Sequence, residues 1–497
     1  MTGSSLLLLG IDLGTSSLKV VLVDSAGAVR ASAARAYPID TPHPGWAEQD
    51  PQTWIDAADE CIRACLSEAG VPRGSVAGLG LSGQMHTLVC LDRSGRPVRP
   101  AILWADQRSA PQVEQVTNLL GREKLKAWTG NPLAAGFMLA SWLWLRAEKP
   151  ETAGKTCTLL LPKDYLRYRL TGEPGSEPSD ASSTLLFDPY HQDWSAEILH
   201  ALEIDRALLP SLHPSAAVAG GLSAEAASRC ELRPGLPVVF GGGDQAMQAV
   251  GNGIIAPGQL SATIGTGGQL FAPLAEPVPD PGLRVHLFCH ALPRTWHLLA
   301  AVLSAGLCLR WLRDQVFGGG DFQAIADAAA QVPAGAEGLF FLPYLAGERT
   351  PYMDPNLRGA FLGLGLRHGQ AHLARAVMEG VAFSLRQGLD LIGELAAPVE
   401  RLVASGGGSG HPLWLQLMAD IFDRPIWQTR TREAAAVGAA LLAGVGAGIY
   451  ADIPAACKET VRWYPEPVLP DPHRAELYSR KYAEFRRLTP ALREWLR

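Results

Sequence analysis

Residues 6–24, LLLLGIDLGTSSLKVVLVD, run from one apolar stretch through a short polar corner into a second apolar stretch. Two apolar runs joined by so short a glycine-containing corner predict a buried β-hairpin. Glycine lets the backbone approach a ligand closely, and Gly14, Thr15 and Ser16 supply N–H groups and hydroxyls that can face an anion. Asp12 stands at the end of the first strand, where its carboxylate can bind Mg²⁺. The corner therefore predicts a site for phosphate and Mg²⁺.

The same pattern returns in residues 260–273, LSATIGTGGQLFAP, where Gly265, Thr266 and Gly267 form the corner. A single Gly-Thr hairpin is more often an ordinary turn than a binding site. Two of them in matching contexts indicate an internal duplication, with one hairpin in each half. We therefore expect a nucleotide to be held between two related domains.

The length and charge of the chain limit the classes of protein to be considered. At 497 residues it is too long for one core, and we place a boundary near Pro234–Gly235, giving domains 1–235 and 236–497. Lys and Arg number 43 against 49 Asp and Glu, with no long basic tract, so a nucleic-acid partner is not expected. The 8 cysteines form no C-x-x-C pair, a reduced pattern that is typical of the cytoplasm.

Neither of the two long apolar runs predicts a membrane segment. The N-terminal run has no basic region before it and contains Asp12, unlike a secretory signal peptide. Residues 434–451 are uncharged, but they are rich in Ala and Gly, which gain little free energy from lipid. A small-residue helix packed inside the protein is the better interpretation. We expect a cytoplasmic protein with no membrane partner.

Polar residues follow the predicted strand 76–81. The chain continues through Gln84, Met85 and His86 before a second short strand at 88–91. Ligands of α/β proteins usually bind beyond the ends of buried strands, so these side chains are candidates for substrate contacts. Taken alone, His86 is more often a structural histidine that bonds to the backbone.

A second candidate group ends the apolar stretch 99–108, RPAILWADQR, which we expect to form another strand. Trp104 offers an aromatic face for the C–H surface of a sugar, and Asp106 can bind sugar hydroxyls. Together with His86, these residues predict a polyol pocket at two adjacent strand ends.

Residues 236–240 predict a buried strand that runs into three consecutive glycines, Asp244 and Gln245. Asp at the start of a helix is often only an N-cap. Capping does not require three glycines, whereas a wall without side chains would let a substrate reach Asp244. We therefore assign Asp244 as a catalytic base, with Gln245 beside it in the substrate pocket.

A third glycine-rich loop, with Gly406, Gly407 and Gly408, separates a short strand at 403–405 from a helix that starts at Pro412. Backbone N–H groups at a helix N-terminus favour anions, so this loop is a further candidate for nucleotide binding. The sequence contains no G-x-x-x-x-G-K-[ST], which excludes P-loop chemistry.

Other predicted elements concern packing or stay open in function. Glu348 and Arg349 close the predicted strand 340–349 and are as consistent with a structural ion pair as with a site. The helical patterns lie at 52–69, 131–149, 163–170, 373–389 and 470–497.

These features together predict phosphoryl transfer to a hydroxyl group. Asp12 would bind Mg²⁺, Thr15 and Thr266 would lie beside the phosphates, and Asp244 would accept the hydroxyl proton. Two other classes stay open: an actin- or chaperone-like ATPase that switches shape, and a sugar sensor without catalysis. The first leaves residues 84–86 unexplained, and the second would need neither carboxylate.

Many ordered motifs carry a family resemblance along nearly the whole chain. They are GIDLGTSSLKV (10–20), GWAEQDP (45–51), LSGQMH (81–86), RPAILWADQR (99–108), LLPKDYLRYRLTG (160–172), SDASST (179–184), GGGD (241–244), FCHALPRTWHLL (288–299), FLPYLAGERTP (341–351) and ASGGG (404–408). With these motifs the chain resembles the FGGY carbohydrate kinases, and among them those that act on D-xylulose.

The resemblance implies a duplicated ribonuclease-H-like α/β fold of the actin/hexokinase type, with two domains around a central cleft. It implies phosphorylation of D-xylulose at its terminal hydroxyl, with ATP and Mg²⁺ as cofactors, Asp244 as the base, and Met85 and His86 on the sugar. Asp12 and the three glycine loops fall in the nucleotide and metal motifs of the family. Ribulose, gluconate and glycerol stay open as alternative acceptors, and a homodimer is an open expectation.

Four residues depart from the pattern of the family. Thr87, Ala105, Ser141 and Gln245 stand where the family usually has Gly, Asn, Lys and Asn. None of these changes removes a catalytic group, but they leave the identity of the sugar open.

Overall fold

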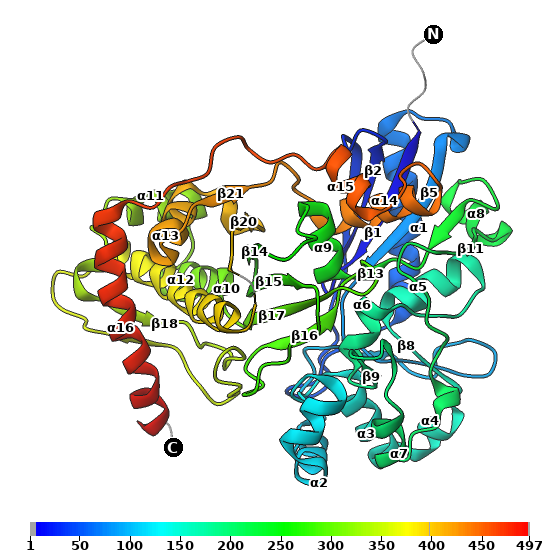
Figure 1. Cartoon of the computed structure of the whole chain (residues 1–497), viewed down its shortest axis with the longest axis horizontal. Coiled ribbons are helices and arrows are strands. Elements are labelled where there is room, and N and C mark those ends of the chain that lie inside the picture. The colour runs from blue at the N-terminus through cyan, green and yellow to red at the C-terminus, as the bar shows by residue number, and fades with distance from the viewer. Residues whose placement is uncertain (1–5, 397, 496–497) are drawn as a thin grey trace.

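The computed structural model describes residues 6–396 and 398–495, which form two mixed β-sheets with helices packed around them (Figure 1). The first sheet has the strand order β11-β12-β5-β1-β2-β3, with β13 paired to β5. Its strands are β1 (Leu7–Leu13), β2 (Ser17–Asp24), β3 (Val29–Ala36), β5 (Val76–Gly83), β11 (Val218–Gly221), β12 (Pro237–Val239) and β13 (Gly242–Gly243). The second sheet has the order β16-β17-β15-β14-β20-β21. Its strands are β14 (Gln259–Ile264), β15 (Gly268–Leu274), β16 (His286–Cys289), β17 (Trp296–Val302), β20 (Arg401–Ser405) and β21 (Ile426–Gln428).

The two sheets repeat one arrangement of strands. β1 and β2 form an antiparallel hairpin with Leu13 opposite Leu18, and β14 and β15 form another with Ile264 opposite Gly268. In each sheet the first hairpin strand pairs in parallel with a later strand, which is β5 or β20. The second hairpin strand pairs antiparallel with β3 or β17, and a further parallel strand, β12 or β21, lies beyond β5 or β20. Both predicted hairpins and the predicted duplication are confirmed.

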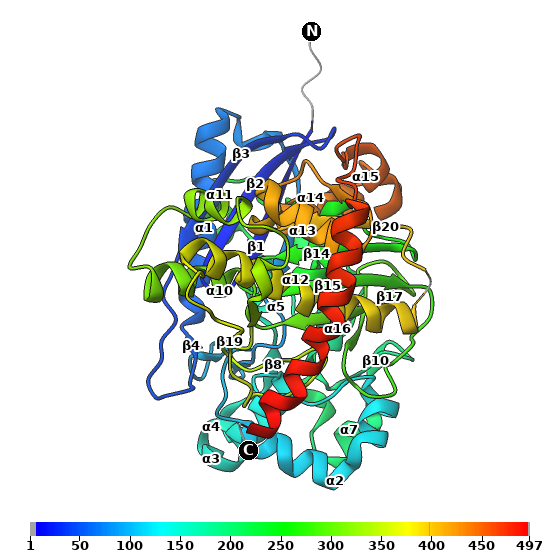
Figure 2. The same cartoon turned by 90° about the vertical axis from the view of Figure 1, so that its left-hand side faces the viewer.

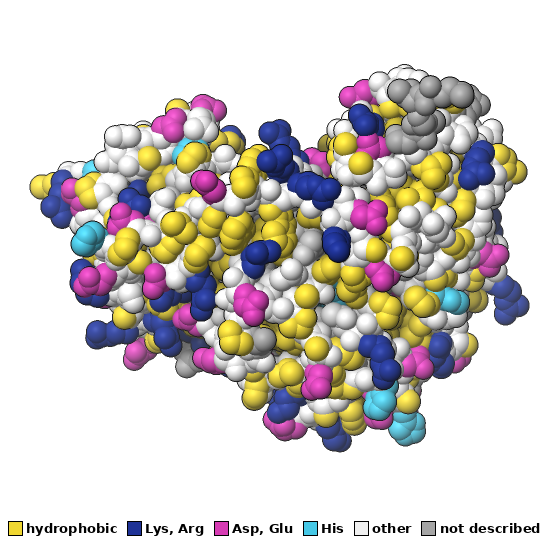
Figure 3. All heavy atoms as spheres, turned by 45° about the horizontal axis from the view of Figure 1, so that its top comes forward, with side chains coloured by type: hydrophobic (Ala, Val, Ile, Leu, Met, Phe, Trp, Pro, Cys, Tyr) yellow, Lys and Arg dark blue, Asp and Glu magenta, His cyan; other side chains and the backbone are white. Residues whose placement is uncertain are grey.

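The two sheets lie in separate lobes (Figure 1). The surface is hollowed between the lobes, and Lys and Arg side chains gather along this hollow (Figure 3). The sequence placed the domain boundary at 235/236, but β12 and β13, which follow it, pair with β5 in the first sheet. The chain enters the second sheet only at β14. We therefore propose a boundary between the end of helix α9 (Asp244–Asn252) and β14.

The predicted small-residue helix is α14 (Ala434–Gly446), which is buried almost throughout and packs on β1, β5 and α9. The prediction of a buried helix is confirmed, although the helix ends at Gly446 rather than Ala451. A Cβ added to Gly10 of β1 would overlap the carbonyl oxygen of Ala436, and one added to Gly80 of β5 would overlap that of Ala439. Only glycine therefore allows the sheet to approach the helix this closely.

Within residues 6–396 and 398–495, no helix has both the length and the apolar character needed to cross a membrane.

Three predicted helices have the expected extents within about one residue: α1 (Pro51–Ala69), α5 (Pro162–Thr171) and α13 (Pro412–Phe422). The helix predicted at 373–389 is confirmed as α12 (Gln370–Leu395), which is longer at both ends. The last helix, α16 (Pro472–Trp495), crosses the second domain beside α13 (Figure 2). The end of its predicted range, residues 496–497, lies outside the described residues.

Three predicted elements are shorter than expected. The helix predicted at 131–149 is α3 (Met138–Glu148), because the Asn131 amide donates to the carbonyl oxygens of Thr129 (2.8 Å) and Leu287 (2.7 Å) instead of joining a helix. The apolar stretches at 99–108 and 340–349 form only the short strands β7 (Ala101–Ile102) and β18 (Phe340–Leu342). Side-chain hydrogen bonds of Asp106 and Glu348 hold the remainder in turns.

We predict that Gly80→Ala lowers the free energy of unfolding by about 1–3 kcal/mol or more, because the new methyl group overlaps the Ala439 carbonyl oxygen. The matched control is Gly154→Ala on the exposed helix α4 (Pro150–Lys155), where an added Cβ meets no atom within 4 Å. That change should be neutral or stabilise by up to about 1 kcal/mol. Urea unfolding followed by tryptophan fluorescence measures both, and equal midpoints for the two variants would contradict the prediction.

Candidate active site

Asp12 and Asp244 lie close enough for the charge of Asp12 to act on Asp244. Asp12 follows the buried strand residue Ile11 on β1, and the Ser82 hydroxyl of β5 donates to its Oδ1 at 2.8 Å. Asp244 is the first residue of α9, and both carboxylates are partly buried. Burial and then the negative charge of Asp12 raise the pKa of Asp244 to about 7. The pKa of Asp12 is also raised, mainly by burial.

A pair of carboxylates that repel one another favours a bound cation between them. Among residues 6–396 and 398–495, no cluster of three or more His, Cys, Asp or Glu side chains is arranged to hold a metal ion. A Mg²⁺ ion needs no such cluster when one or two carboxylates and the phosphates of a nucleotide supply its ligands. Asp12 therefore fits the requirement for Mg²⁺, and Asp244 lies close enough for the charge of Asp12 to raise its pKa.

The predicted glycine wall is β13, which pairs in parallel with the end of β5 so that Gly242 lies opposite Ser82 and Gly243 opposite Gly83. A Cβ added to Gly243 would stand 3.1 Å from Cγ of Met85. Met85 is therefore packed directly against the wall that leads to Asp244. Hydrogen bonds from the side chain and backbone of Gln245 oppose the rise in the pKa of Asp244.

A buried charged cluster behind this wall is absent from the sequence-based assignment. Its members are Lys163, Asp164, Glu177 and Asp180, and all four side chains are fully buried. The Lys163 ammonium lies 2.7 Å from Asp164, 3.4 Å from Glu177 and 3.5 Å from Asp180. The only sequence signal was that Lys163 and Asp164 fall inside the motif LLPKDYLRYRLTG and Asp180 inside SDASST, whereas Glu177 lies between the two motifs.

The cluster reaches the base through one hydrogen-bonded chain. The Gly243 N–H donates to Ser179 Oγ at 3.1 Å, and the Ser179 hydroxyl donates to Glu177 Oε1 at 2.8 Å. Glu177 also accepts the Ser215 hydroxyl at 2.6 Å. Because Gly243 directly precedes Asp244, this chain fixes the start of α9.

His86 has a strained backbone and an ordered ring. Its φ of 71° is uncommon for a residue with a side chain, and such strain is often found at functional sites. The ring stacks on Phe137 with centroids 3.9 Å apart, and Nδ1 lies 2.8 Å from the carbonyl oxygen of Ser183. Burial and then Arg349 lower the pKa of His86 to about 3. A neutral ring that donates from Nδ1 leaves Nε2 as a hydrogen-bond acceptor.

Trp104 joins the two groups that the sequence assigned separately. Its indole N–H donates to Thr15 Oγ1 at 2.8 Å, so the aromatic residue of the predicted sugar pocket touches the predicted phosphate loop. The backbone N–H of Trp104 donates to the hydroxyl of Thr87 at 3.1 Å. Thr87, one of the departures from the family pattern, therefore helps to orient this residue.

Two predicted substrate residues serve other purposes in the structure. Asp106 is fully buried, and its carboxylate accepts the N–H of Ala47 at 2.6 Å and the guanidinium of Arg108 at 2.7 and 2.9 Å. The assignment of Asp106 to the sugar pocket is corrected, because its oxygens are already used. Gln84 is also buried; its amide faces the Gly14 carbonyl at 3.4 Å and supports the first hairpin.

The second hairpin and the third glycine loop lie side by side at the ends of β14 and β20. Thr263 and Ser405 are opposite one another in the parallel pairing, and their hydroxyl oxygens are 2.8 Å apart. Thr266 is exposed at the tip of its corner between Gly265 and Gly267. A Cβ at Gly406, which has φ 79°, would lie 2.7 Å from the Ile264 carbonyl oxygen, whereas one at Gly407 would meet no atom within 4 Å. The space beside Gly407 is therefore open to a ligand.

Glu348 and Arg349 do not pair with one another through their side chains. The Glu348 carboxylate accepts the N–H groups of Leu303 (2.9 Å) and Arg349 (2.8 Å). The Arg349 guanidinium instead lies 5.8 Å from the ring centroid of Trp104 and 5.7 Å from that of Phe137. The second domain thus places a cation against aromatic residues of the first.

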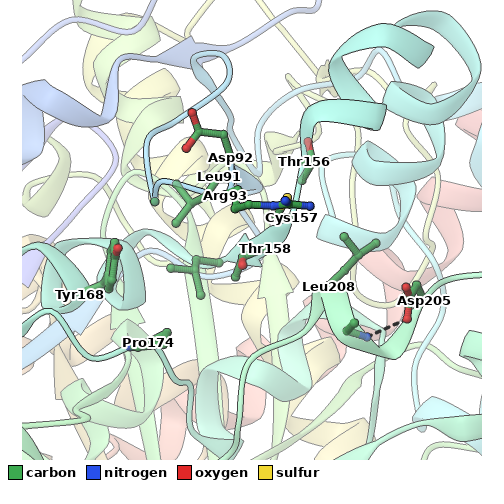
Figure 4. Close-up of a pocket in the computed structure, with 13 residues that line it drawn as sticks. Leu91, Asp92, Arg93, Thr156, Cys157, Thr158, Tyr168, Pro174, Asp205 and Leu208 are labelled. Carbon is green, nitrogen blue, oxygen red and sulfur yellow. Dashed lines mark hydrogen bonds between the residues drawn. The ribbon is translucent and has the colours of Figure 1, made fainter.

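A separate hollow of about 560 Å³ lies on the first domain (Figure 4). Its lining includes Asp92, Cys157, Tyr168 and Asp205. None of the predicted site residues lines this hollow.

Comparison with known proteins accounts for both halves of this arrangement. Residues 7–251 match the N-terminal domain of the FGGY family of carbohydrate kinases, and residues 260–447 match the C-terminal domain. The chain is 38% identical to a xylulose kinase of Escherichia coli over 487 residues, covering 97% of this chain and 98% of that one. It is 37% identical to a xylulose kinase of Lactococcus lactis over 476 residues, covering 95% and 94%. A gluconokinase of Bacillus subtilis is 31% identical over 456 residues, covering 89% and 87%.

Solved structures agree with the fold. A xyloylose kinase from Brucella ovis superposes with a TM-score of 0.90 at 35% identity and covers 98% of this chain and 100% of its own. A xylulose kinase from Rhodospirillum rubrum gives a TM-score of 0.89 at 31% identity, with 99% of each chain covered. The predicted ribonuclease-H-like, actin-type fold of two domains is confirmed, and the chain belongs to the FGGY family of carbohydrate kinases.

Proposed function

We propose that this sugar kinase transfers the γ-phosphate of ATP to D-xylulose and forms D-xylulose 5-phosphate. The observation that carries the proposal is the pair Asp12 and Asp244, one at a phosphate-binding type of hairpin and one behind a wall of glycines. The xylulose kinases of Escherichia coli and Lactococcus lactis, at 38% and 37% identity over almost their whole length, support this choice of sugar. The similarity to a gluconokinase keeps a sugar acid as the alternative acceptor.

In the proposed mechanism Asp244 accepts the proton of the sugar hydroxyl as that hydroxyl attacks the γ-phosphate. Asp244 begins α9 at a position fixed through Gly243 and Ser179, within reach of the charge of Asp12. Asp12 would bind Mg²⁺, which neutralises phosphate charge when it is bound. The corners at residues 14–16 and 265–267 and the loop 406–408 would hold the nucleotide. Closure of the two domains would exclude water from the transfer.

The sugar would lie between Trp104, Met85 and His86. The neutral ring of His86 can accept a hydrogen bond from a sugar hydroxyl through Nε2, because Nδ1 faces the Ser183 carbonyl oxygen. A nucleotide-dependent switch would have no use for this acceptor or for an open wall beside Asp244. These two features favour a kinase over an actin-like ATPase.

We also propose that the protein works in the cytoplasm. All 8 cysteines are free thiols, which is consistent with a reducing cytoplasm. A homodimer stays a prediction.

We predict that D-xylulose gives the highest rate of sugar-dependent ADP release with Mg-ATP. The comparison includes L-xylulose, D- and L-ribulose, glycerol, gluconate and a reaction without sugar.

Asp244→Ala should lower kcat by about 10²–10⁴-fold, because the positioned base is lost, and should leave nucleotide binding nearly unchanged. ADP release that ignores every sugar, or a variant that keeps a tenth of the wild-type kcat, would count against the mechanism.

We predict that His86→Ala raises the KM for the sugar about tenfold or more and changes the KM for ATP less than about twofold, since one hydrogen-bond acceptor is removed from the pocket. His213→Ala is the control, because the His213 ring also stacks on a phenylalanine, Phe240, at 4.4 Å, while its Nε2 lies 2.9 Å from the Ser211 hydroxyl. Equal changes in the two KM values would remove His86 from the sugar pocket.

We predict that kcat/KM for the sugar rises with pH and levels off above about 7, because Asp244 must lose its proton before it can act as a base. Below the raised pKa the carboxyl is protonated, so the rate falls about tenfold for each pH unit. Initial rates between pH 5.5 and 8.5 at saturating Mg-ATP measure the profile, and samples returned to pH 7.5 show whether the enzyme survived. A flat profile across this range would contradict the assignment.

A further inference from the structure

We propose that Arg349 is a sugar-binding residue that enters the pocket from the second domain and donates hydrogen bonds to the carbonyl end of a ketose. This end is the one remote from the hydroxyl that Asp244 deprotonates. The inference rests on the proposed function and extends it from a sugar to the specific chemistry of a hydroxyketone.

The first support is the position of the guanidinium between the domains. Arg349 follows β18 in the second domain, whereas Trp104 and Phe137, whose ring centroids lie 5.8 and 5.7 Å from its Cζ, belong to the first. The Trp104 indole N–H is hydrogen-bonded to Thr15 in the first hairpin, and the ring of Phe137 stacks on the ring of His86. The cation therefore stands against the two aromatic residues that border the predicted sugar pocket.

The second support is the lack of a partner for this cation. Across residues 6–396 and 398–495, no carboxylate or carbonyl oxygen bonds to the Arg349 guanidinium, although the residue is partly buried. The carboxylate of the adjacent Glu348 accepts hydrogen bonds from the backbone N–H groups of Leu303 and Arg349, and burial raises its pKa to about 8. A partly buried guanidinium with its donors unused is costly unless a ligand accepts from them.

The third support is that hydrogen-bond acceptors surround the same point. The charge of Arg349 lowers the pKa of both His86 and His286, after burial, so both rings are close to it and neutral. His286 Nδ1 lies 3.2 Å from Asn131 Oδ1, which leaves Nε2 as a buried acceptor without a protein partner. Donors from Arg349 beside acceptors from two histidines complement a carbonyl oxygen next to a hydroxyl. That pair of groups is the hydroxyketone end of a 2-ketose.

We place Asp244 and Arg349 at opposite ends of the sugar pocket. The charge of Asp12 raises the pKa of Asp244, and the charge of Asp244 raises that of Asp180, whereas the charge of Arg349 lowers the pKa values of His86 and His286. A sugar that spans the pocket would therefore present its reacting hydroxyl to Asp244 and its carbonyl to Arg349.

The test compares Arg349→Met, which removes the charge and keeps much of the bulk, with Arg349→Lys, which keeps the charge and loses the planar fork. The matched control is Arg401→Met. Arg401 is also partly buried and lies over two aromatic rings, Trp427 (5.1 Å) and Trp463 (4.5 Å), but at the opposite end of β20 from the glycine loop. The measurements are kcat, the KM values for D-xylulose and ATP, the thermal midpoint, and the inhibition constant of xylitol, which has a hydroxyl in place of the carbonyl.

We expect Arg349→Met to raise the KM for D-xylulose about 10- to 100-fold, with kcat and the KM for ATP within about threefold. The inhibition constant of xylitol should change much less, so that the preference for the ketose over the alditol falls at least about fivefold. Arg349→Lys should lie between the wild type and Arg349→Met, and Arg401→Met should behave as the wild type.

Three results would overturn the inference. If Arg349 only stabilises the contact between the domains, Arg349→Met lowers the thermal midpoint and weakens the binding of D-xylulose and xylitol equally. If it binds a phosphate, the KM for ATP rises or kcat falls while the sugar preference stays. If the wild type itself prefers an acceptor without a ketone, both the sugar in the proposed function and the carbonyl contact are wrong. Preference for another ketose corrects only the sugar, and the variants are then measured on that ketose.

Discussion

The close contact of α14 with the first sheet determines where the catalytic carboxylates stand. Helix backbone and strand backbone touch at Gly10 and Gly80, where no Cβ could fit. α14 also packs on α9, and again a glycine is required, because a Cβ at Gly438 would overlap the Met247 carbonyl oxygen. One helix of small residues therefore contacts the three elements that carry Asp12, Ser82 and Asp244. Any added volume along this surface would be transmitted to the distance between the two acids.

The buried cluster around Lys163 shows a different way of fixing the same site. Charges removed from water are costly, and such a cluster is weak evidence for stability. Burial also raises the pKa of Asp180 well above its ordinary value, which lowers the negative charge that the cluster must carry. The cluster instead orients the backbone before Asp244. Glu177 accepts a hydrogen bond from the Ser179 hydroxyl, and Ser179 Oγ accepts one from the N–H of Gly243. The glycine strand β13, which has no side chains of its own, is thus held in place by this hydrogen-bonded chain.

The sequence predicted best those features that depend on local pattern. Both hairpins, the helix after the third glycine loop and the buried character of α14 follow from periodicity and composition over short ranges. Asp106 was misassigned because a carboxylate near an aromatic residue looks the same in sequence whether it faces a ligand or Arg108. The separate roles of Glu348 and Arg349 depend on Leu303 and Trp104, which lie far away in the chain, so no local pattern could distinguish an ion pair from two independent groups.

The position of α14 in the chain also has a consequence for biosynthesis. The strands of the first domain leave the ribosome early, but the helix that covers β1 and β5 consists of residues 434–446. Until that segment has been synthesised, one apolar face of the first sheet has no permanent cover. Domains usually fold in order as they emerge, yet here the first domain cannot be completed before most of the second. A nascent chain of this protein must therefore keep an unfinished sheet from aggregating for most of its translation.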